Sequence, residues 1–414
     1  MAIDNKDKKV LKSSIEREQN EVACSAECEK IKGSKNLNVP PLRFPEFSGE
    51  WEKKKLKDVC TFYSGGTPSS SNKDYYFGDI PFIRSGELHE RSTELFISED
   101  GLNNSSAKMV YKGDLLLALY GATSGDIAIS QIEGAINQAI LCINTKHSKE
   151  YIKAIWQKHV QKILQTYLQG GQGNLSADIV KNISFYFTSS KEQDKLANFI
   201  RLLDERIATQ NKIIEDLKKL KSAIVDKLYS YTNGETYSFR QLFEVVNEKN
   251  KKLTYKNVLS ASQELGMIER SDINIDIKFE QESISGYKIV RKGDYIVHLR
   301  SFQGGFAFSD RTGICSPAYT ILHPNNLVIY GYLSHFFTSM PFIKSLKLVT
   351  YGIRDGRSIN VDEWLNMTVI LPTMQEQTHI LTIINAIDAK LHNEAKYQSC
   401  LFRQKSYLLN TLFI

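Results

Sequence analysis

The sequence predicts an α+β protein: a tandem pseudo-symmetric repeat of two α/β domains joined by two long helices that form an antiparallel coiled coil. Three observations support this fold class: a duplicated helical segment, apolar residues at coiled-coil spacing in both copies, and a second duplicated motif inside each half. The chain has 414 residues, 42% hydrophobic and 24% charged, which is typical of a soluble protein of two or three domains.

The duplicated segment starts at Ser189 and again at Thr373. Glu192 matches Glu376 at an offset of 184 residues (376 − 192), and the same offset holds to the end of both segments without a gap. A repeat of this length predicts two copies of one structural unit. In each copy a hydroxyl residue stands three positions before the glutamate, which is the pattern of a capping box at a helix start.

Apolar residues recur at every third or fourth position of both copies, as they do along the seam of a two-helix coiled coil. Polar residues interrupt the two seams at matching positions, Gln210 with Glu394 and Lys221 with Lys405. Because neither seam is apolar enough for a free-standing homodimeric zipper, we expect the helices to pair within one molecule. Packing of each helix on its own domain, or an oligomer, is the alternative. The predicted seam residues are Leu196, Ile200, Leu203, Ile207, Ile214, Leu217, Ile380, Ile384, Ile387, Leu391, Leu401 and Leu408.

The repeat divides the chain into five parts. Residues 1–38 are polar and rich in Lys, Glu, Ser and Asn, and they predict a mobile leader or a loosely docked helix. The first domain then covers residues 39–188 and the first helix residues 189–230. The second domain covers residues 231–372 and the second helix residues 373–414.

Both halves contain the same turn, Lys-Gly-Asp, at Lys112 and at Lys292, an offset of 180 residues (292 − 112). In each half the turn leads into strand candidates, an amphipathic helix (residues 152–167 or 333–346) and a Gly-containing polar loop. The halves share this layout and differ most in their loops. Two related readers with different targets are expected to differ in this way.

The sequence lacks the signatures of several catalytic classes. It has no phosphate-binding loop of the G-x-x-x-x-G-K-[ST] type, no dinucleotide turn and no N-P-P-[YF] tetrapeptide of an amino-methyltransferase. Apart from Cys24 and Cys28 the six cysteines are scattered, and the eight histidines form no H-x-x-x-H pair. We therefore predict no catalytic residue, no metal site and no cofactor in this chain. Since no apolar run reaches the length of a membrane span and no secretory signal is found, we expect a cytoplasmic protein without a membrane partner.

Polar loops on two rigid scaffolds are what DNA reading requires. Lysine and arginine neutralise phosphates, whereas Arg, Gln, Asn, Ser and Thr reach base edges, and the net charge of +6 permits a polyanionic partner. Structural roles are the alternative: the glycines at 65–66 bend the chain, the lysines at 53–57 form a solvated helix edge, and the aromatic residues at 75–77 pack in the core. The candidate DNA-binding residues are Ser64, Gly65, Gly66, Thr67, Arg84, Ser85, Tyr120, Thr123, Gln172, Asn174, Lys251, Lys252, Arg300, Ser301, Gln303, Arg354, Arg357, Ser358 and Asn360.

Three motifs occur in an order known from one protein family. The first is W-x4-L-x-D-V-x3-Y-S-G-G-T-P-S from Trp51 to Ser69, and the second is Y-Y-x-G-D-I-P-F-I from Tyr75 to Ile83. The third is the helix entry E-Q-x2-[LI], which occurs twice. With these motifs the chain, from about Val39 to its end, resembles the specificity subunits of type I restriction–modification systems.

The resemblance implies a non-catalytic subunit with two target-recognition domains, each of which reads one half of an asymmetric bipartite site in double-stranded DNA. It implies two modification subunits, which bind S-adenosylmethionine and methylate adenine, docked on the helices and domains. Restriction subunits, which are translocating nucleases that use ATP with Mg, would join them. The competing interpretation is a coiled-coil interaction scaffold that does not read DNA.

Overall fold

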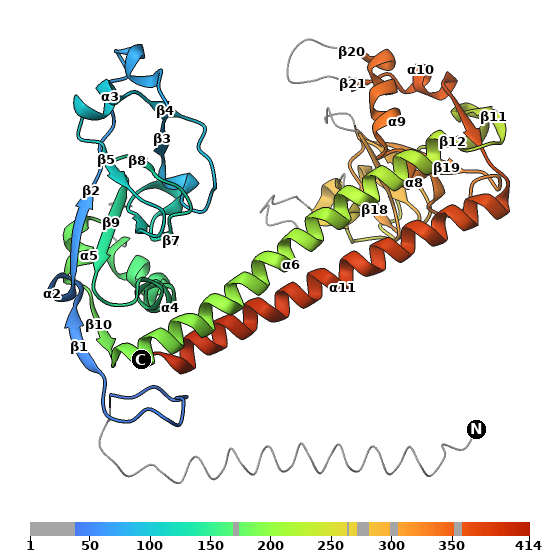
Figure 1. Ribbon diagram of the computed structural model, residues 1–414. Coiled ribbons are helices and arrows are strands. Elements are labelled where there is room, and N and C mark those ends of the chain that lie inside the picture. Colours follow the sequence, from blue (N-terminus) through green and yellow to red (C-terminus); the bar gives the residue numbers. More distant parts are fainter. Residues whose placement is uncertain (1–37, 169–173, 263–264, 271–280, 299–304, 352–357) are drawn as a thin grey trace, which may run out of the picture. The chain divides into compact units, whose positions relative to one another are not determined.

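The computed structural model divides into two compact units, which we describe separately (Figure 1). The first unit ends at Ile207 and takes in Cys400–Ile414, and the second unit is Ala208–Ser399. The division falls inside the two long helices. The residues that the structure describes are 38–168, 174–262, 265–270, 281–298, 305–351 and 358–414.

The described part of the first unit contains two four-stranded sheets, of order β2-β9-β6-β7 and β4-β3-β8-β5. All neighbours in the first sheet are antiparallel, whereas β3 and β8 of the second sheet are parallel. The strands are β2 (Cys60–Ser64), β3 (Ile80–Ile83), β4 (Phe96–Ile97), β5 (Lys108–Val110), β6 (Leu115–Ala118), β7 (Ile127–Ile129), β8 (Gly134–Ile136) and β9 (Ile140–Thr145).

Strand β6 shows how the apolar sequence is used. All four of its residues are buried, and successive side chains face opposite ways. Leu115 and Leu117 pack in the core that contains residues of helix α4 (Lys149–Leu168), whereas Leu116 and Ala118 pack with residues of the second sheet. The uninterrupted apolar run therefore reflects a strand that is covered on both faces.

Lysine side chains mark the entry to the first unit. Lys53, Lys54 and Lys55 lie on β1 (Glu52–Lys55), which pairs with β10 (Ser184–Phe187), and α2 (Leu56–Val59) follows at once. The expectation that residues 53–57 form a helix edge is thus wrong for three of the four lysines. The short α5 (Ala177–Asn182) precedes β10.

The second unit repeats the first sheet. Its four-stranded sheet has the order β12-β19-β16-β17, the counterpart of β2-β9-β6-β7. The other described strands of this unit form two-stranded pairs, β11 with β22, β13 with β14, β15 with β18 and β20 with β21. The strands are β11 (Glu235–Ser238), β12 (Phe243–Val246), β13 (Leu259–Ser262), β14 (Gly266–Glu269), β15 (Lys288–Val290), β16 (Tyr295–Val297), β17 (Phe306–Phe308), β18 (Gly313–Cys315), β19 (Thr320–Pro324), β20 (Thr350–Tyr351), β21 (Ser358–Ile359) and β22 (Thr368–Leu371).

The amphipathic helix expected at residues 333–346 is broken into three pieces, α8 (Tyr332–Phe336), α9 (Met340–Ser345) and the 3-10 helix η7 (Leu346–Val349). Ser339 caps α9 by accepting a hydrogen bond from the Phe342 amide, and Pro341 follows in the first turn. Proline cannot donate the hydrogen bond that a continuous helix needs, so the chain restarts there. Its apolar face still packs, together with α7 (Phe239–Leu242) and α10 (Val361–Asn366).

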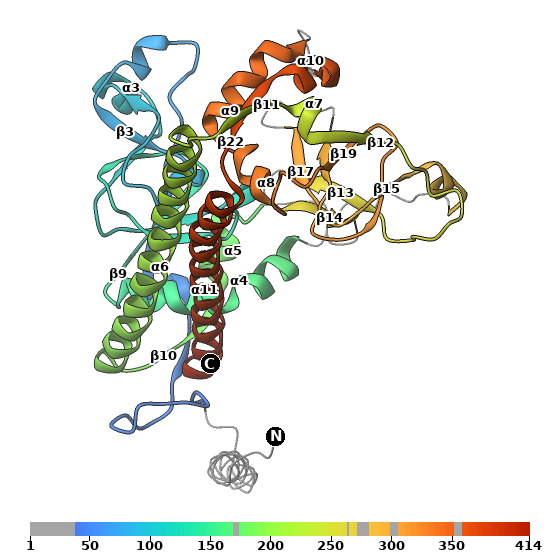
Figure 2. The same ribbon diagram turned by 90° about the vertical axis from the view of Figure 1, so that its right-hand side faces the viewer.

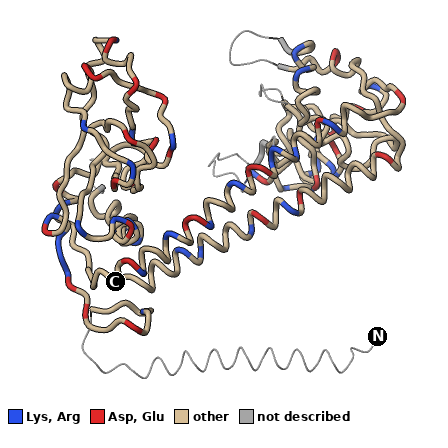
Figure 3. The backbone as a smooth tube through the Cα atoms, viewed as in Figure 1, with Lys and Arg blue, Asp and Glu red and all other residues tan. Residues whose placement is uncertain are grey.

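Two long helices run through both units, α6 (Ser190–Ser230, 41 residues) and α11 (Met374–Leu412, 39 residues). They lie alongside each other in both views, with acidic and basic residues interspersed (Figures 1, 2 and 3). In the first unit Asp204 pairs with Lys405 at 2.6 Å, and in the second unit Lys221 pairs with Asp388 at 2.5 Å. Because the partner numbers on α11 fall as those on α6 rise, the helices are antiparallel.

These ion pairs are equivalent under the repeat, since Asp204 and Asp388 differ by 184 residues, as do Lys221 and Lys405. Gln210 contacts its own equivalent: its amide donates to the Glu394 carboxylate at 2.5 Å. The register of the helix pair is therefore symmetric about this contact. All twelve predicted seam residues are buried or half-buried, and the predicted fold class is confirmed.

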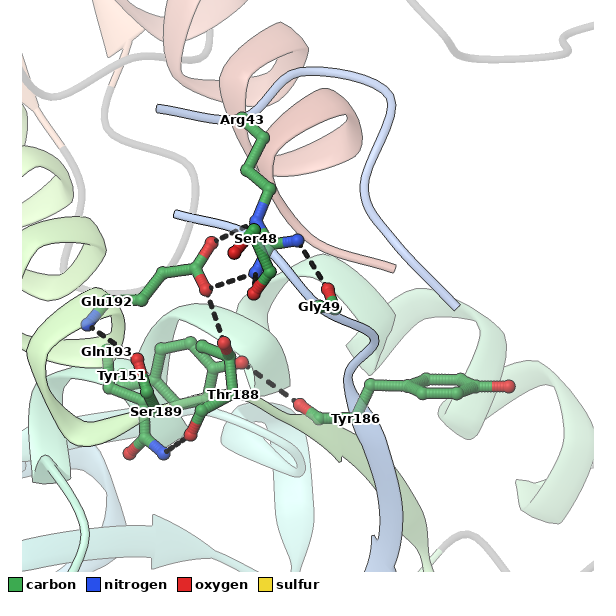
Figure 4. A network of polar contacts seen from close by, with 9 residues as sticks. All are labelled: Arg43, Ser48, Gly49, Tyr151, Tyr186, Thr188, Ser189, Glu192 and Gln193. Carbon is green, nitrogen blue, oxygen red and sulfur yellow. Dashed lines mark hydrogen bonds and ion pairs between the residues drawn. The ribbon is translucent and has the colours of Figure 1, made fainter. Parts of the chain in front are cut away.

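The two helix starts differ. Thr373 and Glu376 form the expected capping box, with backbone amide to side-chain oxygen distances of 3.2 and 3.3 Å. At the first start, Ser189 accepts from the Glu192 amide at 3.4 Å, but the Glu192 carboxylate does not return the bond (Figure 4). It accepts instead from Thr188 and from two nitrogens of Arg43, each at 2.7 Å. The reciprocal capping box predicted here is wrong because a more distant cation takes the carboxylate.

This carboxylate anchors the segment that enters the first unit. Glu192 is 1% exposed, and Arg43 also donates to the carbonyl oxygens of Ser48 and Gly49 (Figure 4). The hydrogen bonds that Arg43 donates to Glu192 raise the pKa of Arg43; partial burial opposes this shift, and the Coulomb attraction of Glu192 adds to it. Residues 43–49 are therefore fixed against the start of α6 by a charge pair between the half-buried Arg43 and a buried carboxylate.

Candidate nucleic-acid interface

Strand register brings the predicted loops of the first unit to one edge. In the first sheet Ser64 lies opposite Leu141 and Ala118 opposite Ile140, so the ends of β2 and β6 meet the start of β9. In the second sheet β3 and β8 are parallel, and their carboxyl ends therefore lie together (Figure 1). The loops that begin after residues 64, 83, 118 and 136 leave the sheets at this edge, which we call the first loop edge.

Two glycines join the sheets at the first loop edge. A Cβ atom on Gly65 would lie 1.7 Å from the carbonyl oxygen of Ile136, and one on Gly66 would lie 2.7 Å from the Ser106 side chain. No side chain fits in either place, because real contacts of this kind stay beyond 3 Å. The glycines at 65–66 thus allow a close approach of backbones, and this places Thr67 at the loop edge.

Thr67 is exposed and its hydroxyl donates to the Oε1 atom of Gln138 at 2.5 Å. Gln138 is exposed too and lies in the short connection between β8 and β9. It is absent from the set of candidates predicted from the sequence. A polar pair, Asn137-Gln138, between two apolar strands is the signal that could have identified it.

Arg84 lies at the first loop edge but is bound to acidic side chains. It donates to Glu87 at 3.1 and 3.2 Å and to Glu94 at 2.6 Å. The hydrogen bonds that Arg84 donates to these carboxylates raise its pKa. A phosphate would have to compete with both carboxylates. Ser85, half-buried, begins the 3-10 helix η3 (Ser85–Glu87).

The loop after β6 carries the other predicted residues of the first half. Tyr120 is half-buried and packs on the core of α4, while Thr123 ends the 3-10 helix η4 (Gly121–Thr123). The amide of Leu175 donates to the carbonyl oxygen of Leu119 at 3.0 Å, which brings the exposed Asn174 to the same loop. The predicted Gln172 lies outside the described residues.

The aromatic residues at 75–77 divide between core and surface. Tyr76 packs in a small core and donates from its hydroxyl to the Pro68 carbonyl at 2.7 Å. Phe77 is 77% exposed, so the expectation of a core position is wrong for this residue. It follows directly after the 3-10 helix η2 (Lys73–Tyr76) as its C-terminal cap residue.

The second unit has an equivalent loop edge. Val246 lies opposite Ile321 and Val297 opposite Thr320, so the ends of β12 and β16 meet the start of β19. We call this the second loop edge. The predicted Arg300, Ser301 and Gln303, which follow β16 along the chain, lie outside the described residues, as do Arg354 and Arg357.

Lys251 and Lys252 are exposed in the loop that leaves β12. The loop is closed by Asn250, which is 1% exposed and whose side chain exchanges hydrogen bonds with the backbone of Tyr255 at 2.8 and 3.2 Å. The lysines are thus held at the surface by a buried amide.

Asn360 has a structural role in α10. Its side chain accepts from the Glu363 amide at 3.3 Å and donates to the Glu363 carboxylate at 2.9 Å, as a helix cap does. Ser358 belongs to β21, which pairs with β20. Contact of these residues with DNA stays a prediction.

A cavity of about 720 Å³ lies in the second unit, lined by residues of α6, α8, β17 and α11. The Lys221–Asp388 pair and His335 lie on its wall. Burial, together with the smaller repulsion from nearby Lys221, lowers the pKa of His335 to about 4. His335 is therefore neutral at pH 7.

The geometry defines a class of protein: a repeat of two related scaffolds, each with its own polar loop edge, and two long helices whose register is symmetric. Comparison with known proteins agrees, because the type I restriction modification DNA specificity domain matches residues 48–219 and 234–399. The chain belongs to this family of type I restriction–modification specificity proteins. Its role is to supply such a complex with DNA sequence specificity.

Individual relatives span different shares of the chain. It is 21% identical over 406 residues to the type I restriction enzyme MjaVIII specificity subunit of Methanocaldococcus jannaschii, covering 90% of this chain and 93% of that protein. It is 28% identical over 184 residues to the MjaIX specificity subunit of the same organism, covering 41% of this chain and 42% of that protein. The chain thus spans less than half of the second relative.

Solved structures show the same fold. The S subunit of a type I restriction–modification system from M. genitalium matches with a TM-score of 0.53 and 14% identity, over 91% of this chain and 99% of that one. A chain from a study of complex assembly and conformational transition of the type I R-M system matches with a TM-score of 0.56 and 14% identity, over 90% and 99%. In the part of the chain that the structure describes, no helix is long and apolar enough to cross a membrane.

Proposed function

We propose that this chain is a non-catalytic subunit that reads an asymmetric bipartite site in double-stranded DNA. Each loop edge would contact one half of the site, as a target-recognition domain of residues 39–188 or 231–372. The observation that carries the proposal is the pair of loop edges, which arise from equivalent strands but present different side chains. The first offers Thr67 and Gln138, and the second offers Lys251 and Lys252.

The partners follow from the symmetry of the helix pair. A register that is symmetric about Gln210 and Glu394 gives two equivalent surfaces, which suits two copies of one partner. In the second unit Ile213 of α6 and Tyr397 of α11, which are 184 residues apart, are both exposed. We infer that two modification subunits dock along these helices and that restriction subunits join the assembly in the cytoplasm. S-adenosylmethionine would then bind to the modification subunits, and ATP with Mg to the restriction subunits.

The test is to express the chain together with a modification subunit from the same source and to sequence the methylated positions of the host genome. The expected result is one bipartite motif with an unread gap, methylated at adenine. Methyl transfer by the purified chain alone would contradict a non-catalytic role.

A scaffold that does not read DNA is the competing function. Binding of the purified assembly to duplexes with and without the motif, over a range of salt concentrations, separates the two. Non-specific binding falls steeply with salt and ignores sequence, whereas reading of bases gives a preference that persists. Equal binding to both duplexes at every salt concentration would favour the scaffold.

A further inference from the structure

The connection between β8 and β9 is a fixed turn at the first loop edge. Asn137 accepts from the Ala139 amide through its side chain at 3.1 Å and from the Ile140 amide through its carbonyl at 3.2 Å. Its own amide donates to the Ile83 carbonyl at 3.4 Å. Three hydrogen bonds therefore hold the turn, and Gln138 stands at its tip with an exposed side chain.

Thr67 orients the amide of Gln138. The threonine hydroxyl donates to the Oε1 atom at 2.5 Å, so the amide nitrogen points away from Thr67. This nitrogen has no hydrogen-bond partner among the described residues. Thr67 is itself placed by Gly65 and Gly66, which lie directly against neighbouring backbone and side-chain atoms. The hydrogen bond from Thr67 thus orients the amide and leaves its two N–H donors unused.

The second unit contains the same turn with a different tip. Ser316 accepts from the Ala318 amide through its hydroxyl at 3.3 Å and from the Tyr319 amide through its carbonyl at 3.1 Å. The tip residue is Pro317, which has no side-chain donor or acceptor. The turn therefore forms without an amide at its tip. The folding of the first loop edge does not explain why glutamine stands there.

An amide fixed in this way matches one base. A glutamine reads adenine in the major groove by donating from its nitrogen to N7 and accepting from the N6 amino group through its oxygen. The oxygen has two lone pairs, and Thr67 uses one of them. We propose that Gln138 reads an adenine of the first half-site and that Thr67 is its positioning residue. This rests on the proposed function, in which the first loop edge contacts DNA.

The test uses the assembled methyltransferase with the full chain and measures competitive binding to a duplex library in which each position of the site is varied. With Gln138→Ala, discrimination for adenine at one position of the first half-site should fall by about 5- to 150-fold, the equivalent of ~1–3 kcal/mol. The second half-site should not change. Gln138→Glu removes the donors at nearly constant shape, and it should shift that position toward cytosine, whose amino group donates to a carboxylate.

Control variants distinguish a role of Gln138 in base recognition from a role in the fold. Gln131 is an exposed glutamine in the loop before β8, at the opposite end of that strand, and Gln131→Ala should leave every position unchanged. Thr67→Val should weaken discrimination at the position that Gln138 reads. Thr67→Ser, which keeps the hydroxyl, should retain the discrimination of the wild-type chain. Thermal unfolding of each variant shows whether the fold is retained.

Unchanged discrimination with Gln138→Ala, or a uniform loss of binding at all positions, would overturn the assignment of Gln138 while the wild-type assembly still reads its bipartite site. A wild-type assembly without any sequence preference would overturn the proposed function as well. A loss at one position of the first half-site alone supports both.

Discussion

The length of the helix pair should set the gap between the half-sites. To test this, we would insert seven residues into each helix, after Asn211 in α6 and before Glu394 in α11. Both insertions lie on the same side of the contact between Gln210 and Glu394. The Gln210–Glu394 and Asp204–Lys405 contacts are kept on one side and Lys221–Asp388 on the other. A heptad preserves the seam because coiled-coil contacts repeat every seven residues.

The expected change follows from helix geometry. Seven residues at 1.5 Å each lengthen each helix by about 10 Å, which corresponds to about three base pairs at 3.4 Å each. Sequencing of methylated positions in cells that express the extended chain should therefore show the same two half-sites with a gap about three base pairs longer.

A control insertion of seven residues into α6 alone shifts Lys221 away from Asp388 and removes the symmetric register. We expect this variant to lose methylation or to unfold at a lower temperature. An unchanged gap in the paired insertion, with full methylation, would refute the idea that the helices act as a spacer.

Three further predictions concern stability and are measured by urea unfolding. Gly65→Ala should cost about 3 kcal/mol or more, because the added Cβ meets a backbone oxygen, whereas Gly86→Ala, with open space around its Cβ, should cost less than ~0.5 kcal/mol. Glu192→Gln removes the charge of a buried carboxylate that pairs with the half-buried Arg43 and should cost about 2 kcal/mol, against ~1 kcal/mol or less for the exposed capping residue in Glu376→Gln. In the folded chain His335 binds a proton only at about pH 4, whereas in the unfolded chain it does so near its ordinary pKa of 6.5. The neutral His335 therefore contributes to the free energy of unfolding above pH 6.5, and this contribution is lost as the pH falls. Between pH 7 and pH 4 this loss should be roughly 2–3 kcal/mol, and His335→Gln should abolish it.

The long helices could be predicted from the sequence because their signal is local. Spacing of three and four residues and a constant offset of 184 are properties of neighbouring positions. Ser339 followed by Pro341 is a local signal for a helix break. The sequence nevertheless predicted one helix, because the apolar spacing continues across the break and the two short helices share one buried face.

Features that depend on distant partners could not be predicted. The capping pattern at Ser189 is correct in form, but Arg43 lies 149 residues before Glu192 and takes its carboxylate. Likewise Arg84 is a residue type that often contacts phosphate, but in this fold Glu94 lies beside it and forms an ion pair with it. Gln138 lies in a short connection that contains no arginine or glycine, and its place at the loop edge depends on the register of β8 and β9.

The two halves share the contacts that hold each domain on its long helix, but they differ in the side chains that we propose contact the bases. Gln193 donates to the carbonyl of Thr188 at 2.6 Å, and Gln377, 184 residues later, donates to the carbonyl of the equivalent Pro372 at 3.0 Å. Both amides are 1% exposed, so they fasten the last strand of each domain to the start of its long helix. At the loop edges the turn is kept while its tip changes. A loop can therefore be exchanged without disturbing the helix register, and specificity at one half-site can change independently of the other half-site and of the gap.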